Sequence, residues 1–143
     1  MNNILIIGCG LLGSSLLRRI HKKKIAKKIF IYEKSKSNVS KIKKLRLPGI
    51  VIDNLDKGAI NYDLIIFCTP MSEYKNLILK INNFITPKTL ITDIGSSKVE
   101  TSRLIKKFLK KIYLGLKVIP LQALRLVAQS MVRKICFKID GAF

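Results

Sequence analysis

The sequence predicts an α/β protein whose strands form a doubly wound parallel sheet. Short apolar runs alternate with segments of helical periodicity, which is the pattern of βαβ units. The run DLIIFCT at residues 63–69 is continuously apolar, as expected of a central strand covered by helices on both faces. The first apolar run ends in a glycine-rich turn. At 143 residues, the chain has room for one domain.

The predicted elements follow one another along the chain. Strands are expected at residues 3–8, 28–32, 50–52, 63–69, 89–93 and 112–114. Helices are expected at residues 11–20, 38–45 and 72–83, and a fourth follows a turn at residues 95–97 and runs to about residue 110. Ser72 is the expected N-cap of the third helix, and Pro48 with Gly49 ends the second. This order of strands and helices is that of a doubly wound fold that binds dinucleotides.

Composition bears on the partners and the location of the protein. The formal net charge is +20, which raises the possibility of a nucleic-acid binder. The lysines are spread over almost every segment, as on solvated helix faces, so we expect no nucleic-acid partner. No apolar run reaches the roughly 20 residues needed to span a bilayer. The basic residues follow the apolar start instead of preceding it. We therefore expect a cytoplasmic protein without membrane association.

Cysteine and histidine usage indicates no metal site. Cys9, Cys68 and Cys136 have neither the spacing of metal ligands nor that of a disulfide framework. We expect each to behave as a small buried apolar residue. His21 is the single histidine of the chain and lies in a basic stretch. We expect it to be a solvated surface residue.

A glycine motif lies between the first strand and the first helix. GCGLLG at residues 8–13 matches G-x-G-x-x-G in the strand–helix context that a Rossmann NAD(P)-binding fold requires. Gly8 permits the tight turn, Gly10 lets the backbone approach the pyrophosphate, and Gly13 lets the helix pack close to the strand. The expected cofactor contacts in this loop are Gly8, Gly10, Leu11, Leu12 and Gly13.

Polar residues follow three of the predicted strands. Glu33 closes the second strand, about 20 residues after the motif, where a carboxylate accepts hydrogen bonds from the adenosine ribose. It would repel a 2′-phosphate, which favours NAD over NADP, although Lys34 and Lys36 could offset this repulsion. Thr69 and Pro70 follow the fourth strand, and DIGSSK at residues 93–98 follows the fifth. We expect the nicotinamide ring and the substrate to meet beside these two turns.

Three segments carry a family resemblance. IIGCGLLGSSL, DLIIFCTP and LITDIGSSK resemble the prephenate and arogenate dehydrogenases, over roughly residues 2–115. The G-S-x-K turn is the specific element. The resemblance implies that Ser96 lies on the substrate side and that Gly8, Gly10, Gly13 and Glu33 contact the cofactor. It also implies oxidation of the ring carbinol of prephenate by hydride transfer to NAD(P), with loss of carbon dioxide, on the route to tyrosine.

Other functions remain open on the sequence alone. If the chain belongs to the resembled family, the expected substrate is either prephenate or arogenate. The expected cofactor is NAD, with NADP as the alternative. A different Rossmann oxidoreductase acting on a small acid or imine is a second candidate, against which the turn at residues 93–98 argues. A dinucleotide-binding module without chemistry is a third.

The last part of the chain departs from the family. Members of the family continue with a motif close to G-S-H-P-I-A-G-x-E, whose histidine hydrogen-bonds the reacting hydroxyl, and then with a helical domain through which they form homodimers. Residues 116–143 lack that motif, and both glutamines of the protein lie there. We interpret residues 1–115 as the dinucleotide-binding domain and residues 116–143 as an out-of-frame or poorly ordered tail. The chain is then an inactive, truncated cofactor-binding fragment.

This interpretation predicts a frameshift near residues 115–116. The codons from Lys117 onward permit S-H-P-I-A-G in the adjacent frame, and Met131 followed by Val132 requires glycine there. Adding or deleting one base near the Leu116 codon should therefore restore a frame that encodes the histidine motif and a helical domain. Sequencing the gene tests this. Codons after Lys117 that are incompatible with S-H-P-I-A-G would contradict it.

Overall fold

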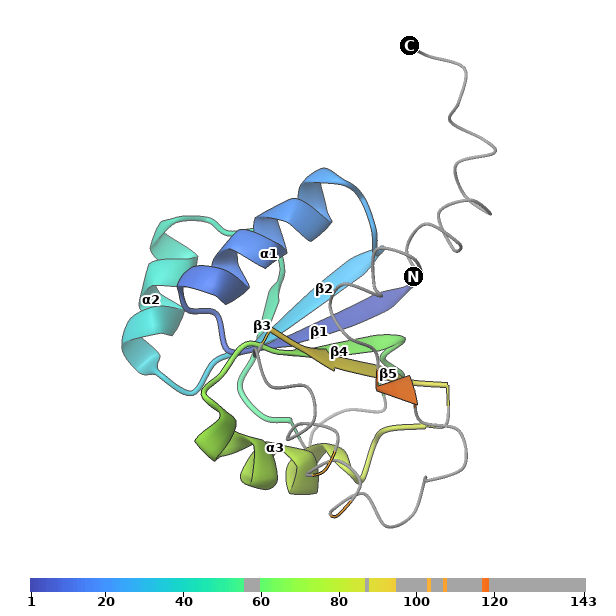
Figure 1. Ribbon diagram of the computed structural model, residues 1–143. Helices are drawn as coiled ribbons and strands as arrows, with labels where there is room; N and C mark the ends of the chain where they lie inside the picture. Colours follow the sequence, from blue (N-terminus) through green and yellow to red (C-terminus); the bar gives the residue numbers. More distant parts are fainter. Residues whose placement is uncertain (56–59, 87, 95–102, 104–106, 108–116, 119–143) are drawn as a thin grey trace, which may run out of the picture.

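The sheet has six strands and carries helices on both faces (Figure 1). The computed structural model describes residues 1–55, 60–86, 88–94, 103, 107 and 117–118. The strands are β1 (Asn3–Ile7), β2 (Lys28–Tyr32), β3 (Ile50–Ile52), β4 (Leu64–Phe67), β5 (Leu90–Asp93) and β6 (Lys117–Val118). They lie in the order β3-β2-β1-β4-β5-β6, and every neighbouring pair is parallel. This is the doubly wound order, so the predicted fold class is confirmed.

The strand bounds differ little from those predicted. The predictions for β2 and β3 are confirmed residue for residue. β4 ends at Phe67, one residue before Cys68, whose N–H donates to the carbonyl of Ile7 at 2.7 Å. The strand predicted at residues 112–114 lies outside the described residues. β6 pairs with β5 at Lys117–Val118.

The first two helices form where predicted, the start of the third is corrected, and the fourth prediction lies outside the described residues except at positions 103 and 107. α1 (Leu11–Lys22) and α2 (Lys36–Lys44) form where predicted, and α2 begins early because the Ser35 hydroxyl accepts the N–H of Asn38 at 3.4 Å. Ser72 was predicted to be the N-cap of the third helix, and this is wrong. It lies inside a 3-10 turn, η1 (Met71–Glu73), and α3 (Tyr74–Ile81) begins only after it. The fixed φ of Pro70 starts this tighter turn.

Alternate residues of each strand enter separate cores on the two faces of the sheet. Leu5 and Ile7 of β1 are fully buried with α3, whereas Ile4 and Ile6 are fully buried with α1 and α2. Figure 1 shows α1 and α2 on one side of the sheet and α3 on the other. Burying one such side chain contributes about 1.5–3 kcal/mol, and covering both faces explains the continuous apolar runs.

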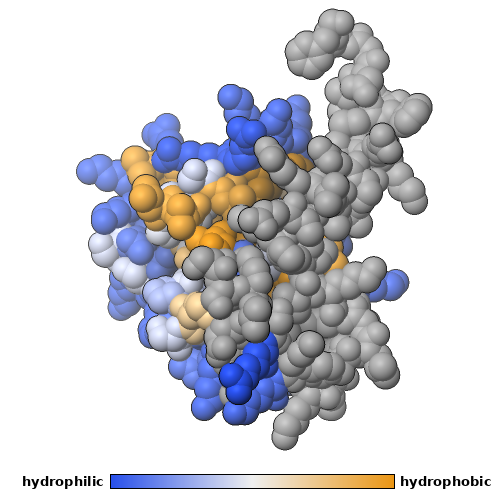
Figure 2. Space-filling view, viewed as in Figure 1, coloured by the Kyte–Doolittle hydropathy of each residue, from blue (hydrophilic) through white to orange (hydrophobic). Residues whose placement is uncertain are grey.

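Apolar side chains also reach the surface near α1. Figure 2 shows a hydrophobic area on the face that carries α1, with hydrophilic residues around it. Leu11 and Leu12, at the start of α1, are 87% and 61% exposed. Both belong to the predicted cofactor loop. Within the described part of the chain, no helix combines the length and the apolar character needed to cross a membrane.

Two neighbouring residues of α3 give a matched test of the packing. Ile78 is fully buried, whereas Leu79 is 48% exposed. Ile78→Ala should lower the free energy of unfolding by about 2–5 kcal/mol, because it removes buried methylene groups and leaves a cavity. Leu79→Ala should change it by less than about 1 kcal/mol. Urea unfolding followed by circular dichroism measures both. Equal losses for the two variants would contradict the difference in burial between Ile78 and Leu79.

Candidate functional site

The glycine loop connects the carboxyl end of β1 to α1. Gly8 has φ = +90°, a conformation that favours glycine, and a Cβ there would lie 2.7 Å from the Thr69 methyl carbon and 2.8 Å from the Cys68 carbonyl oxygen. A Cβ on Gly13 would collide with the Gly8 carbonyl oxygen. A Cβ on Gly10 would meet nothing within 4 Å. Gly8 and Gly13 are therefore required by the fold, while Gly10 faces open space.

The amino end of α1 has no side-chain cap. Gly10 is its N-cap, and no acidic residue lies in the first turn. The helix has 12 residues, and its last turn carries Arg19, His21 and Lys22. Free backbone N–H groups and the positive end of the helix dipole together favour an anion at this position. Above Gly10, the open space gives a pyrophosphate room to approach the backbone.

Glu33 lies directly after β2 and is bound to the glycine loop. Its Oε2 accepts the N–H of Cys9 at 2.7 Å, and its Oε1 accepts the N–H of Ser35 at 2.9 Å. A carboxylate has about four acceptor positions, so positions remain for a ligand hydroxyl. The structure thus brings Glu33 to the loop that holds Gly8 and Gly10, and its contact with a ribose stays a prediction.

A hollow of about 830 Å³ lies at this carboxyl edge of the sheet. Its volume is in the range of small-molecule sites. Its walls come from the end of β1, from the turn after β2, and from the segment that joins β4 to α3. The residues singled out from the sequence that line it are Gly8, Glu33, Thr69 and Pro70. Ligands of open α/β sheets bind at this edge, so this hollow is the candidate site.

Thr69 offers the candidate site a hydroxyl group. Its Oγ1 is buried and has no hydrogen-bond partner among the described residues. Since buried polar atoms are usually paired, an unpaired hydroxyl beside a hollow fits a ligand that supplies the partner. The adjacent Pro70 is exposed. The structure therefore brings Thr69 and Pro70 to the same hollow as Glu33.

The sequence did not single out several residues that line the hollow. These residues are on η1 and α3: Glu73, Asn76, Leu77, Leu79 and Lys80. Glu73 Oε2 lies 3.7 Å from Lys34 Nζ, on the turn after β2. The side chains are 41% and 80% exposed, and exposed ion pairs contribute only about 0–1 kcal/mol to stability. The periodicity of the residues on η1 and α3 indicates a surface helix. Only the order of the strands in the sheet brings this helix opposite Lys34.

The described thiols are unsuited to thiolate chemistry. Cys9 is buried, as predicted, and burial, together with the Glu33 carboxylate, raises its pKa, while Arg18 opposes this effect. Burial raises the pKa of Cys68, which is half-buried, to about 12. Both thiols stay protonated at neutral pH. Cys136 lies outside the described residues, and those described contain no group of three or more His, Cys, Asp or Glu able to hold a metal ion.

The substrate side of the site is described only up to Ile94. Asp93 ends β5 and is 1% exposed, and its Oδ2 accepts the hydroxyl of Tyr74 at 3.1 Å. Burial and the Asp93 carboxylate raise the pKa of Tyr74, so this hydroxyl keeps its proton. The predicted contact Ser96 lies outside the described residues. Its role stays a prediction.

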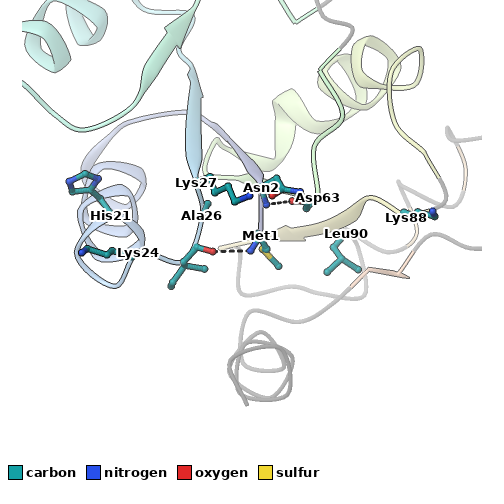
Figure 3. A pocket seen from close by; sticks show the side chains of 10 residues that line it. Met1, Asn2, His21, Lys24, Ala26, Lys27, Asp63, Lys88 and Leu90 are labelled. Atoms are coloured by element: carbon teal, nitrogen blue, oxygen red, sulfur yellow. Dashed lines mark hydrogen bonds between the residues drawn. The ribbon is translucent and has the colours of Figure 1, made fainter. Parts of the chain in front are cut away.

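A second hollow, of about 1020 Å³, lies at the opposite edge of the sheet (Figure 3). It is lined by Met1 and Asn2 before β1, by Asp63 before β4, and by Leu90 at the start of β5. These positions are the amino ends of the strands, where open α/β sheets do not bind their cofactor. His21 also lines this hollow and is exposed, so the prediction of a surface histidine is confirmed.

The sheet order and the glycine loop define a dinucleotide-binding domain. The family profile described as "Prephenate dehydrogenase, nucleotide-binding domain" matches residues 16–120. The chain belongs to this prephenate dehydrogenase family, a family of NAD(P)-dependent oxidoreductases, as the resemblance implied. A prephenate dehydrogenase from Lactococcus lactis subsp. cremoris is 36% identical over 121 residues, which are 82% of this chain and 32% of that protein. The chain thus spans about a third of that relative's length.

Solved structures agree with this fold. Prephenate dehydrogenase from Aquifex aeolicus, in complex with hydroxyphenyl propionate and NAD+, has a TM-score of 0.69 at 22% identity, over 78% of this chain and 40% of that one. An octopine dehydrogenase has a TM-score of 0.68 at 9% identity, over 81% of this chain and 34% of that one. Such likeness shows the dinucleotide-binding fold alone, and the family profile is what separates this chain from other Rossmann oxidoreductases.

The last and the middle glycine of G-x-G-x-x-G, Gly13 and Gly10, can be compared by replacing each with alanine. Gly13→Ala should lower the free energy of unfolding by about 1–3 kcal/mol, because its Cβ would collide with the Gly8 carbonyl oxygen. This loss exceeds the gain of about 1 kcal/mol from alanine in a helix. Gly10→Ala should leave stability nearly unchanged. Thermal unfolding measures both, and a Gly10→Ala variant as unstable as Gly13→Ala would contradict this assignment.

Proposed function

We propose that this chain is the cofactor-binding part of an NAD-dependent prephenate dehydrogenase. The single observation that carries the proposal is the glycine loop at the positive end of α1, with Glu33 bound to it, in a chain of this family. In this proposal the pyrophosphate lies over Gly10, and the adenosine ribose donates its hydroxyls to Glu33. The hollow beside Thr69 takes the adjoining parts of the cofactor.

The reaction we propose for the intact enzyme is the oxidative decarboxylation of prephenate to 4-hydroxyphenylpyruvate. Bound NAD supplies the hydride acceptor. Ser96 is our proposed contact on the substrate side, and Thr69 and Pro70 border the nicotinamide. Arogenate is the alternative substrate, and NADP is the alternative cofactor. We place the enzyme in the cytoplasm, as a homodimer formed through a helical domain and without a nucleic-acid partner.

The first test is the choice of cofactor. The purified 143-residue chain should bind NADH more tightly than NADPH, because the Glu33 carboxylate repels a 2′-phosphate. Glu33→Gln removes the charge and should reduce the ratio of the two dissociation constants by about tenfold, equivalent to about 1.4 kcal/mol. Fluorescence titration with each nucleotide measures the ratio.

Two controls accompany this titration. Asp53→Asn removes an exposed carboxylate that does not line the hollow, and the ratio should not change. Gly10→Leu should abolish the binding of both nucleotides while the chain stays folded. The chain should not oxidise prephenate, since its single histidine lies at the other edge of the sheet. Equal affinities for NADH and NADPH in the unsubstituted chain would remove the role of Glu33.

A further inference from the structure

The hollow at the carboxyl edge has charged groups on both of its sides. Glu33 and Lys34 come from the turn after β2, Glu73 comes from η1, and Lys80 comes from the last turn of α3. The Lys34 ammonium lies 3.7 Å from the Glu73 carboxylate, so this ion pair joins the turn after β2 to η1 at the hollow. The backbone holds Glu73 in place, because its N–H donates to the carbonyl of Pro70 at 3.0 Å.

Lys34 is the cation next in sequence to Glu33. If the ribose hydroxyls bind to Glu33, a 2′-phosphate would stand beside Lys34, and a free lysine there would attract it. The lysine is not free, because Glu73 neutralises it at 3.7 Å. Glu73 also adds a second negative charge to the walls of the hollow. Both effects disfavour a 2′-phosphate and leave the neutral ribose of NAD unaffected.

We propose that Glu73 is a specificity-determining residue that excludes NADP by pairing with Lys34. The inference rests on the proposed function, since it requires the adenosine ribose to bind at Glu33. The pair is too exposed to matter for folding, which separates this role from a structural one. The sequence alone shows that Lys34 follows Glu33, where it could offset the repulsion of a 2′-phosphate, but it does not show the pairing of Lys34 with Glu73.

A cycle of substitutions tests the proposal on the 143-residue chain. Glu73→Gln should lower the dissociation constant for NADPH by about 3- to 10-fold and leave that for NADH within about twofold, because it frees Lys34 and removes a repelling charge. Lys34→Gln alone should change the dissociation constant for NADPH by less than Glu73→Gln does. In the double variant, Lys34→Gln should cancel most of the gain. Asp53→Asn is the control for a lost surface carboxylate.

The outcomes separate this inference from the proposed function. Binding of NADH with an unchanged NADPH-to-NADH ratio in Glu73→Gln would overturn the role of Glu73 and leave the cofactor site intact. A gain for NADPH that persists in the double variant would also overturn it, because Lys34 would then play no part. Failure of the unsubstituted chain to bind either nucleotide would overturn the proposed function, and this inference with it. Unfolding midpoints within about 2 °C of the unsubstituted chain show that the variants are folded.

Discussion

The close approach of α1 to the end of β1 is the constraint on which the candidate site depends. A side chain at Gly13 would occupy the space of the Gly8 carbonyl oxygen, and one at Gly8 would collide with Thr69, which follows β4. The two glycines therefore let three elements meet at one point. As a result, the uncapped amino end of α1 faces the carboxyl edge of the sheet, where the backbone N–H groups can bind an anion.

Glu33 extends this arrangement to β2. Its two carboxylate oxygens accept one N–H from the glycine loop and one from the turn that starts α2. The Glu33 carboxylate, which is the proposed ribose contact, is thus oriented by the same loop that would bind the pyrophosphate. A site with this geometry needs little rearrangement on binding, which limits the entropic cost of ordering it. In the proposed site, the pair of Lys34 and Glu73 would affect the choice of cofactor while contributing little to stability, because both side chains are exposed.

The sequence predicted most of the sheet for a simple physical reason. Central strands covered on both faces are continuously apolar, and such runs are visible without a structure. The ends of the elements were less predictable. Ser72 has the side chain of an N-cap, but Pro70 fixes a 3-10 turn first, so local geometry overrode the preference of the residue. The early start of α2 depends on the hydroxyl of Ser35, a single hydrogen bond that periodicity does not reveal.

The sequence by itself determined the fold class, the glycine loop and the carboxylate after the second strand, because each is a local pattern with one geometric use. Only the tertiary structure decided which distant side chains share the site. The order β2-β1-β4 brings the start of α3 opposite the turn after β2, so Glu73 pairs with Lys34 across 39 positions of sequence. The same order separates His21 from the glycine loop, since the turn after α1 returns the chain to the amino edge. Contacts between segments that are distant in the sequence depend on the order of the strands in the sheet. Short-range periodicity does not indicate this order.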